Sequence, residues 1–186
     1  MKNQKTLEWE KRLAAVQALD PQQHQPLLAE IAKTDEGWRV RFAAVAKLTC
    51  QATLADCMKN DASWHIRCAL VEKLTCQATL ADRMKNDPNW HVRCAAINRL
   101  DDLEQLVEVA QNDSDWHVRR VATERLVNQA ALASIAQNDR AWHVRHVAVE
   151  RLNDAELLAR IEQNDVHGYV RYSAKQRLKE LGRDSK

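Results

Sequence analysis

The sequence predicts an all-α protein, a right-handed α-solenoid (superhelix) of about six to seven helix-pair repeats of 26 residues. Three observations predict this fold class. A tryptophan recurs at a constant spacing, the apolar residues around it follow a helical period, and the 186 residues include only three glycines and three prolines. So few turn-forming residues disfavour an all-β sandwich, which needs a turn about every 8–12 residues. They also exclude a glycine-rich phosphate-binding loop, because the three glycines are scattered.

Four positions define the repeat, and the residues that recur at one position are here called a column. The tryptophans are 26 residues apart, and positions are counted from each of them: Trp38, Trp64, Trp90, Trp116 and Trp142. At Trp−3 stands an aspartate, in Asp35, Asp61, Asp87, Asp113, Asp139 and, one step beyond the last tryptophan, Asp165. At Trp+3 stands an arginine, in Arg41, Arg67, Arg93, Arg119, Arg145 and Arg171. At Trp+10 stands a leucine throughout, and the first unit keeps Trp9, Arg12 and Leu19 at a distance of 29 residues. The predicted units within a single domain, 1–186, are 6–34, 35–60, 61–86, 87–112, 113–138, 139–164 and 165–181, followed by a tail at 182–186.

Each unit is expected to form a longer and a shorter helix. The longer helix is predicted to begin at the aspartate, which is a good N-cap, with Thr6 at the equivalent place in the first unit. Pro88 after Asp87 fits the first helical position. Apolar residues at Trp+2, +6, +7 and +10 then fall on one arc, the expected core face.

The shorter helix is predicted to follow a turn capped by Asp102, Asn128 or Asp154. Its apolar side carries a column of leucines: Leu54, Leu80, Leu106, Leu132 and Leu158. A helix this short is marginal by itself in water, so contacts between neighbouring repeats must stabilise it.

Composition narrows the class of protein further. The 28 basic and 26 acidic residues give a net charge of +2 with no basic block, which weakens a nucleic-acid interpretation. No apolar run approaches the roughly 18 residues of a membrane span. The start of the chain is charged and shows no signal peptide. Five cysteines, an odd number, are interpreted as reduced thiols of a cytoplasmic protein.

The motif D-x-x-W-x-V-R-x-x-A-x-x-x-L resembles the second half of a HEAT repeat in its short bacterial form, from roughly Thr6 to Leu181. The resemblance implies a scaffold or binding protein, without naming the partner. It also implies that the Trp−3 aspartates and Trp+3 arginines form a ladder between neighbouring units, from Asp35/Arg41 through Asp165/Arg171. A period of 26 residues is short for HEAT, and the leucine-rich variant repeat, another α-solenoid, is the rival assignment.

Three repeated columns favour structural roles. The Trp+3 arginine lies inside the apolar arc, which favours a guanidinium buried between units over ligand or phosphate binding. The tryptophans are expected to seal the seams between units, the alternative being a row of stacking platforms for bases. The basic column at Trp+9 is expected to interact with the helix dipole, the alternative being a stripe along a phosphate backbone: Lys47, Lys73, Arg99, Arg125, Arg151 and Arg177.

The exposed side of the longer helix is the predicted binding face, which in HEAT-like arrays lines the concave surface. Trp+1 carries His65, His91, His117 and His143, and Trp+4 changes from Phe42 through Cys68, Cys94, Arg120 and His146 to Tyr172. A varied exposed position beside a regular core is expected of a repeat-protein binding face, although an ordinary solvated face stays an open alternative. The hypothesis is that Arg120, His117, His143 and His146 contact the ligand. Binding of an acidic partner should then strengthen as the pH falls.

Metal binding is the last candidate chemistry. His65-x-x-Cys68 and His91-x-x-Cys94 place zinc-type ligands on neighbouring helices, but helices about 8–10 Å apart do not bring parallel side chains to the roughly 2.0–2.3 Å that zinc needs. Cys50 and Cys76 stand where other units have a capping residue, and a helix N-terminus can lower a thiol pKa.

No catalytic, metal or cofactor site is therefore predicted. The predicted function is non-catalytic binding of an unknown protein or peptide by a monomer or weakly self-associating chain. The alternative is nucleic-acid binding of the DNA-repair type, because some similar HEAT-like solenoids are DNA glycosylases for alkylated bases.

Overall fold

The computed structural model describes residues 2–184, and this range contains thirteen helices and no strand. The chain divides into two compact units, with the boundary between Arg99 and Leu100. The first unit holds α1 (Lys2–Ala18), α2 (Gln25–Thr34), α3 (Trp38–Lys47), α4 (Gln51–Asn60), α5 (Trp64–Lys73), α6 (Gln77–Asn86) and α7 (Trp90–Arg99). The second unit holds α8 (Leu106–Asn112), α9 (Trp116–Arg125), α10 (Gln129–Asn138), α11 (Trp142–Arg151), α12 (Ala155–Asn164) and α13 (Gly168–Asp184).

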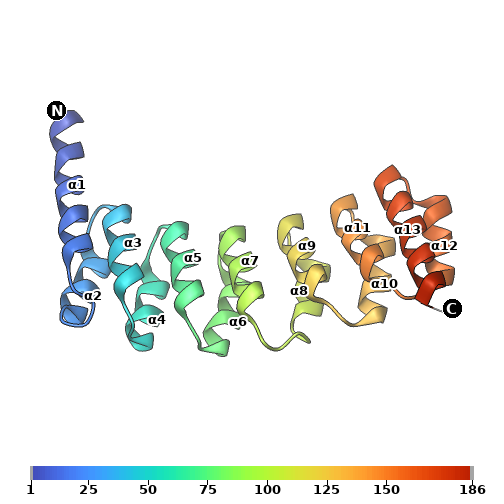
Figure 1. Cartoon of the computed structure of the whole chain (residues 1–186), viewed down its shortest axis with the longest axis horizontal. Coiled ribbons are helices and arrows are strands. Elements are labelled where there is room, and N and C mark those ends of the chain that lie inside the picture. The colour runs from blue at the N-terminus through green and yellow to red at the C-terminus, as the bar shows by residue number, and fades with distance from the viewer. Residues whose placement is uncertain (1, 185–186) are drawn as a thin grey trace. The chain divides into compact units, whose positions relative to one another are not determined.

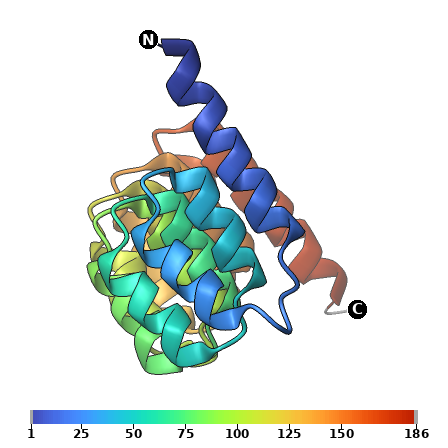
Figure 2. The ribbon, with the colours of Figure 1, turned by 90° about the vertical axis from the view of Figure 1, so that its left-hand side faces the viewer.

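Each unit is a stretch of α-solenoid, which confirms the predicted fold class. Helices pair in chain order, α2 with α3 and α6 with α7 in the first unit, and α10 with α11 and α12 with α13 in the second. The helices that begin at the tryptophan position also pack on one another, α3 on α5 and α5 on α7, then α9 on α11 and α11 on α13 (Figure 1). The longer α1 packs on α3 and projects past it at the N-terminal end (Figure 2).

The predicted helix starts are wrong at the aspartates. The five helices α3, α5, α7, α9 and α11 begin at the tryptophan itself and run for 10 residues, the same length as α4, α6, α10 and α12, whereas α13 after Asp165 begins at Gly168 and runs for 17 residues. Asp61 instead ends α4, where its N–H donates to the Cys57 carbonyl at 3.2 Å, and its Oδ1 accepts the Ser63 N–H at 2.7 Å. The aspartate therefore closes the loop between two helices, because its carboxylate turns toward an arginine of the preceding repeat.

Two further residues that were predicted to start a helix do not do so. Pro88 lies in the loop before α7. Thr6 lies inside α1, and its side chain falls outside the described residues.

The predicted caps of the second helix set are right in two cases of three. The Asn128 side chain accepts the Ala131 N–H at 3.0 Å, and the Asp154 side chain accepts the Leu157 N–H at 2.9 Å. Asp102 does not cap α8. It accepts hydrogen bonds from Glu104 and Gln105, and this local turn delays the start of α8, which has only seven residues.

The predicted core face is confirmed. In α9 and at its C-cap, buried residues occupy Trp+2, +6, +7 and +10: Val118, Ala122, Thr123 and Leu126. The leucine column of the other helix set is buried as well: Leu54, Leu80, Leu106, Leu132 and Leu158. In α13, Lys175 stands at the Trp+7 position and is exposed. The core of each unit therefore lies between its two helix layers.

No helix within residues 2–184 combines the length and the apolar character that crossing a membrane requires.

Candidate interaction face

An arginine–aspartate ladder joins neighbouring repeats within each unit. Each rung runs from the Trp+3 arginine to the aspartate of the next repeat, so that Arg119 donates through Nε and Nη2 to the two carboxylate oxygens of Asp139 at 2.7 and 2.9 Å. The same fork joins Arg12 to Asp35, Arg41 to Asp61, Arg67 to Asp87 and Arg145 to Asp165. The fork matches the geometry of a carboxylate, which makes these charge-assisted hydrogen bonds strong.

The aspartate of the arginine's own repeat contributes a different group. Arg119 Nη1 donates to the backbone carbonyl of Asp113 at 2.8 Å, and Arg93 Nη1 donates likewise to that of Asp87 at 2.9 Å. Asp113 also accepts the Asp115 N–H through its side chain. Arg67, Arg93, Arg119 and Arg145 are buried, whereas Arg171 at the end of the array is exposed and bonds to the Asp165 carbonyl at 2.6 Å.

The Trp+1 histidines form a second ladder, made of stacked rings. In the second unit His143 lies between Trp116 and Trp142, with ring centroids 4.2 and 3.7 Å away, and His117 stacks on Trp116 at 3.7 Å. In the first unit His65 lies between Trp38 and Trp64, and His91 between Trp64 and Trp90. His91, His117 and His143 are half-buried, and His65 is exposed.

Around Trp64, Trp116 and Trp142 the ring stack occupies the indole faces that a nucleic-acid base would need. Trp64 has His65 on one side and His91 on the other, and Trp142 lies between His143 and His167, the latter at 4.1 Å. The tryptophans therefore join successive repeats, as the seam interpretation expects.

The basic column at Trp+9 is also part of the framework. Arg125 Nη2 donates to the Leu100 carbonyl at 2.8 Å, and Arg151 Nε donates to the Leu126 carbonyl at 3.1 Å. Equivalent bonds are made by Lys47, Lys73, Arg99 and Arg177. Apart from Arg177, which lies within the longer α13, these cations stand in the last turn of their own helix, as the dipole interpretation expects, and each also satisfies a backbone carbonyl of the preceding repeat.

A glutamine column completes the same junction and was not recognised in the sequence. Gln25 Nε2 donates to the Lys47 carbonyl at 2.9 Å, and its Oε1 accepts the Thr49 N–H at 3.0 Å. Gln51 makes the same two bonds in the next repeat. The column could have been found from the 26-residue spacing of Gln25, Gln51 and Gln77, with Gln129 two periods after Gln77.

These columns take part in packing. The surface that carries the variable Trp+4 residues is here named the Trp-helix face. It is the solvent-facing side of α3, α5 and α7 in the first unit, and of α9, α11 and α13 in the second. In the first unit it bears a groove of about 840 Å³ between α1, α3 and α5. Leu13, Trp38, Phe42, Ala43 and Ala69 supply its apolar lining, and the predicted residues His65 and Cys68 lie in its wall. Phe42 and Trp38 are 43% and 36% exposed.

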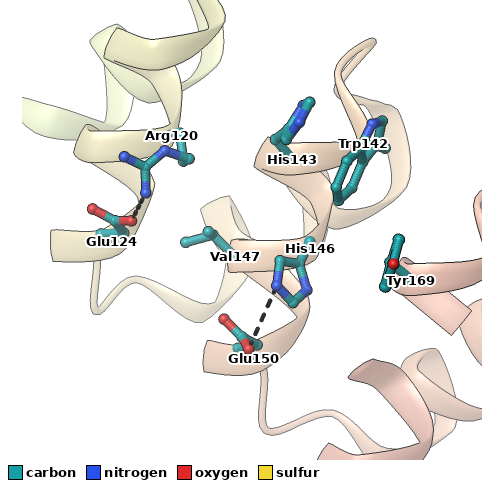
Figure 3. Close-up of a pocket in the computed structure, with 8 residues that line it drawn as sticks. All are labelled: Arg120, Glu124, Trp142, His143, His146, Val147, Glu150 and Tyr169. Atoms are coloured by element: carbon teal, nitrogen blue, oxygen red, sulfur yellow. Dashed lines mark hydrogen bonds and ion pairs between the residues drawn. The ribbon is translucent and has the colours of Figure 1, made fainter. Parts of the chain in front are cut away.

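In the second unit the Trp-helix face carries a pocket of about 360 Å³ (Figure 3). Arg120 and Glu124 enter it from α9, His143, His146 and Glu150 from α11, and Tyr169 from α13. A second pocket of about 370 Å³ shares His146, Glu150 and Tyr169 and adds Tyr172 and Ser173. The structure thus brings Arg120, His143 and His146 together and places Tyr172 beside them, whereas His117 lies in the ring stack.

Charges in the pocket are largely paired. Arg120 forms an ion pair with Glu124 on its own helix, and in the second pocket Arg177 pairs with Glu180 at 3.0 Å. Burial lowers the pKa of His143, and the nearby His167, His117, Arg120 and His146 lower it further because each adds positive charge.

Ser173 is a pocket residue that sequence reasoning missed. It is buried, and its hydroxyl lies 2.7 Å from Nδ1 of His146 in the neighbouring repeat. The other repeats have Ala43, Ala69, Ala95, Val121 or Val147 at this position, so the departure from the column was a usable signal. Ser173 lies inside α13, where backbone N–H groups bond within the helix.

The cysteines show two kinds of environment. Burial raises the pKa of the Cys68 thiol to about 11. Cys50 and Cys76 are exposed at the N-caps of α4 and α6, where hydrogen bonds from Thr53 and Thr79 lower their pKa. Across the described part of the chain, no group of three or more His, Cys, Asp or Glu side chains is placed to hold a metal ion.

Comparison with protein-family models, with curated proteins and with solved structures finds no match for this chain.

Proposed function

We propose that the chain is a non-catalytic binding protein whose Trp-helix face binds a protein or peptide. The apolar groove of the first unit carries the proposal. Exposed apolar residues are common one at a time, but Phe42 and Trp38 lie together with Leu13 around one concave surface. Binding sites for polypeptides combine such a surface with aromatic anchors and a polar rim.

The rim of the groove supports a polypeptide partner. The Arg39 guanidinium lies over the Trp38 ring at 4.6 Å and over the Trp9 ring at 5.4 Å, which holds it at the edge of the apolar surface. Glu72 and Lys47 line the same groove. Both signs of charge around an apolar centre suit a segment with an apolar side chain flanked by polar groups.

The contacts of the Trp+3 arginines, the Trp+9 cations and the tryptophans argue against nucleic-acid binding. A phosphate backbone needs available cations and a base needs an open aromatic face. The Trp+9 cations donate to backbone carbonyls, and the Trp+3 arginines donate to carboxylates. The indoles of Trp64, Trp116 and Trp142 have a histidine ring on both sides.

We also propose that the 26-residue helix pairs are short HEAT-like repeats. The arginine–aspartate rungs between neighbouring repeats, which the HEAT resemblance implies, support this assignment over the leucine-rich variant repeat.

Affinity capture from a lysate of the source cells, treated with nuclease, tests the binding proposal. Phe42→Asp places a charge in the groove, and Val127→Asp is the matched control because Val127 is exposed outside it, between α9 and α10. A protein should be retained by the wild type and the control, and titration of the purified partner should show a loss of at least about tenfold in affinity for Phe42→Asp. Equal retention by all three proteins would contradict the proposal, and capture that depends on omitting nuclease would favour nucleic acid.

A further inference from the structure

Glu150 is an exposed acidic side chain on the second unit's Trp-helix face whose ion-pair partner is a histidine and not an arginine or a lysine. Its side chain is 55% exposed, and its Oε1 lies 3.7 Å from His146 Nε2, which is beyond hydrogen-bond distance. The neighbouring carboxylates differ, because Glu124 is paired with Arg120 and Glu180 with Arg177. The Glu150 carboxylate, which is not part of an arginine ion pair, is therefore presented where the two pockets meet.

Two tyrosine rings line the second pocket together with Glu150. Tyr169 and Tyr172 are 68% and 61% exposed. Tyr169 occupies the Trp+1 position, which is a histidine in four other repeats, but its own repeat has Gly168 in place of the tryptophan. Its ring therefore has no tryptophan of its own repeat to stack on, and it stacks on Trp142 of the preceding repeat at 5.7 Å and on His167 at 5.8 Å. Replacement of the tryptophan by glycine thus leaves a large part of this ring available to a ligand.

The floor of the pocket is fixed by contacts between repeats. The contact of 2.7 Å between Ser173 and Nδ1 of His146 sets the orientation of the imidazole ring. The imidazole and Glu150 both come from α11, and the tyrosines from α13, so two packed helices hold the groups in place. A pre-organised site loses less entropy when a ligand binds.

We infer that this pocket binds a basic side chain, lysine or arginine, presented by the polypeptide partner. The inference rests on the proposed function and adds the chemistry of the partner. A cation is attracted to the carboxylate of Glu150 and to the faces of aromatic rings, while its aliphatic stem packs on Tyr169 and Val147. The partner's charge is opposite to the one that the histidine columns alone predict, because Arg120 is neutralised by Glu124.

Titration with four short peptides, followed by NMR, tests this inference on the full chain. The probes are acetyl-Gly-X-Gly-amides in which X is lysine, arginine, glutamine or glutamate. The lysine and arginine peptides should shift the ring signals of Tyr169, Tyr172 and His146 with saturation in the millimolar range, and the other two should not. Glu150→Gln should weaken binding of the basic peptides by about five- to tenfold, because the attraction between the carboxylate and the bound cation is lost.

Glu156→Gln is the matched control, since Glu156 is an exposed glutamate on α12 of the same unit, and it should bind the basic peptides like the wild type. Preserved dispersion of the backbone amide signals shows that each variant is folded. Equal affinity of Glu150→Gln, or shifts of the same rings by the glutamate peptide, or no shift by the basic peptides up to about 20 mM, overturns the inference. If that happens while capture still depends on Phe42, the proposed function stands and only the partner's chemistry is wrong.

Discussion

Replacing Arg119 by alanine should destabilise the second unit strongly. The side chain is 3% exposed and that of Asp139 is 4% exposed, so the pair is shielded from water. Truncation removes two hydrogen bonds to the Asp139 carboxylate and one to the Asp113 carbonyl. Removing one partner of a buried ion pair costs about 3–5 kcal/mol. Because Asp139 keeps the Ala141 N–H at 2.8 Å, the lower end of that range is expected, about 3 kcal/mol.

Urea unfolding and thermal melting, both followed by far-UV circular dichroism, measure this cost. In a chain of this size, 3 kcal/mol corresponds to a fall in Tm of about 6–12 °C. Arg171→Ala is the matched control, because Arg171 makes the same bond to a backbone carbonyl but is exposed at the end of the ladder, and it should cost about 0.5 kcal/mol or less. The double variant Arg119→Met, Asp139→Asn should regain at least about 1 kcal/mol, since no carboxylate is left stranded. An Arg119→Ala protein that melts within about two degrees of wild type would refute the structural role of the ladder.

Three further outcomes are expected. Cys50 and Cys76, which are exposed and have lowered pKa, should react with iodoacetamide near neutral pH well before Cys57 and Cys68; equal rates in peptide mapping would contradict this. The folded state lowers the pKa of His143, so its contribution to stability is complete above the ordinary value of about 6.5 and is lost as the pH falls through that value toward the folded one. The urea midpoint of unfolding should therefore fall between pH 7 and pH 5, and it should fall less steeply in His143→Gln. Equal slopes for the two proteins would contradict this role of His143. Fluorescence anisotropy with single- and double-stranded oligonucleotides should detect no submicromolar binding at about 150 mM salt, and tight, salt-sensitive binding would reverse the choice between partner classes.

The repeat and its core could be predicted from the sequence because both depend on local period. Val118, Ala122 and Leu126 fall on one arc at 100° per residue, and nothing outside the helix is needed to place them in the core. The burial of Arg119 followed from the same arc, since a charged residue in its middle must meet a partner.

The helix starts could not be predicted in the same way. Asp139 has the residue type of an N-cap, but its carboxylate is held by Arg119 of the preceding repeat and by the Ala141 N–H. A contact between repeats thus outweighs the local preference for capping. The position of His143 between two indoles has a similar origin, because it depends on side-chain rotamers and on the tryptophan of the previous repeat.

The pocket of the second unit was only half visible in the sequence. Arg120 and His146 were marked by their variation at Trp+4, but the ion pair of Arg120 with Glu124 depends on rotamers that the pattern does not contain. Ser173 and Tyr169 break otherwise regular columns, and such a break is the sequence signal for a site that one repeat does not share with the others.

Site-specific photo-crosslinking in a lysate of the source cells tests the Trp-helix face most directly. A photoreactive phenylalanine analogue replaces Phe42 or Tyr172 on that face, and Ala52 of α4 or Ser134 of α10 as exposed controls on the other helix layer. The account predicts that the same protein is crosslinked from Phe42 or Tyr172, resists nuclease treatment, and is absent from the control positions. Crosslinks that form equally from Ala52 and Ser134, or only to nucleic acid, would contradict it.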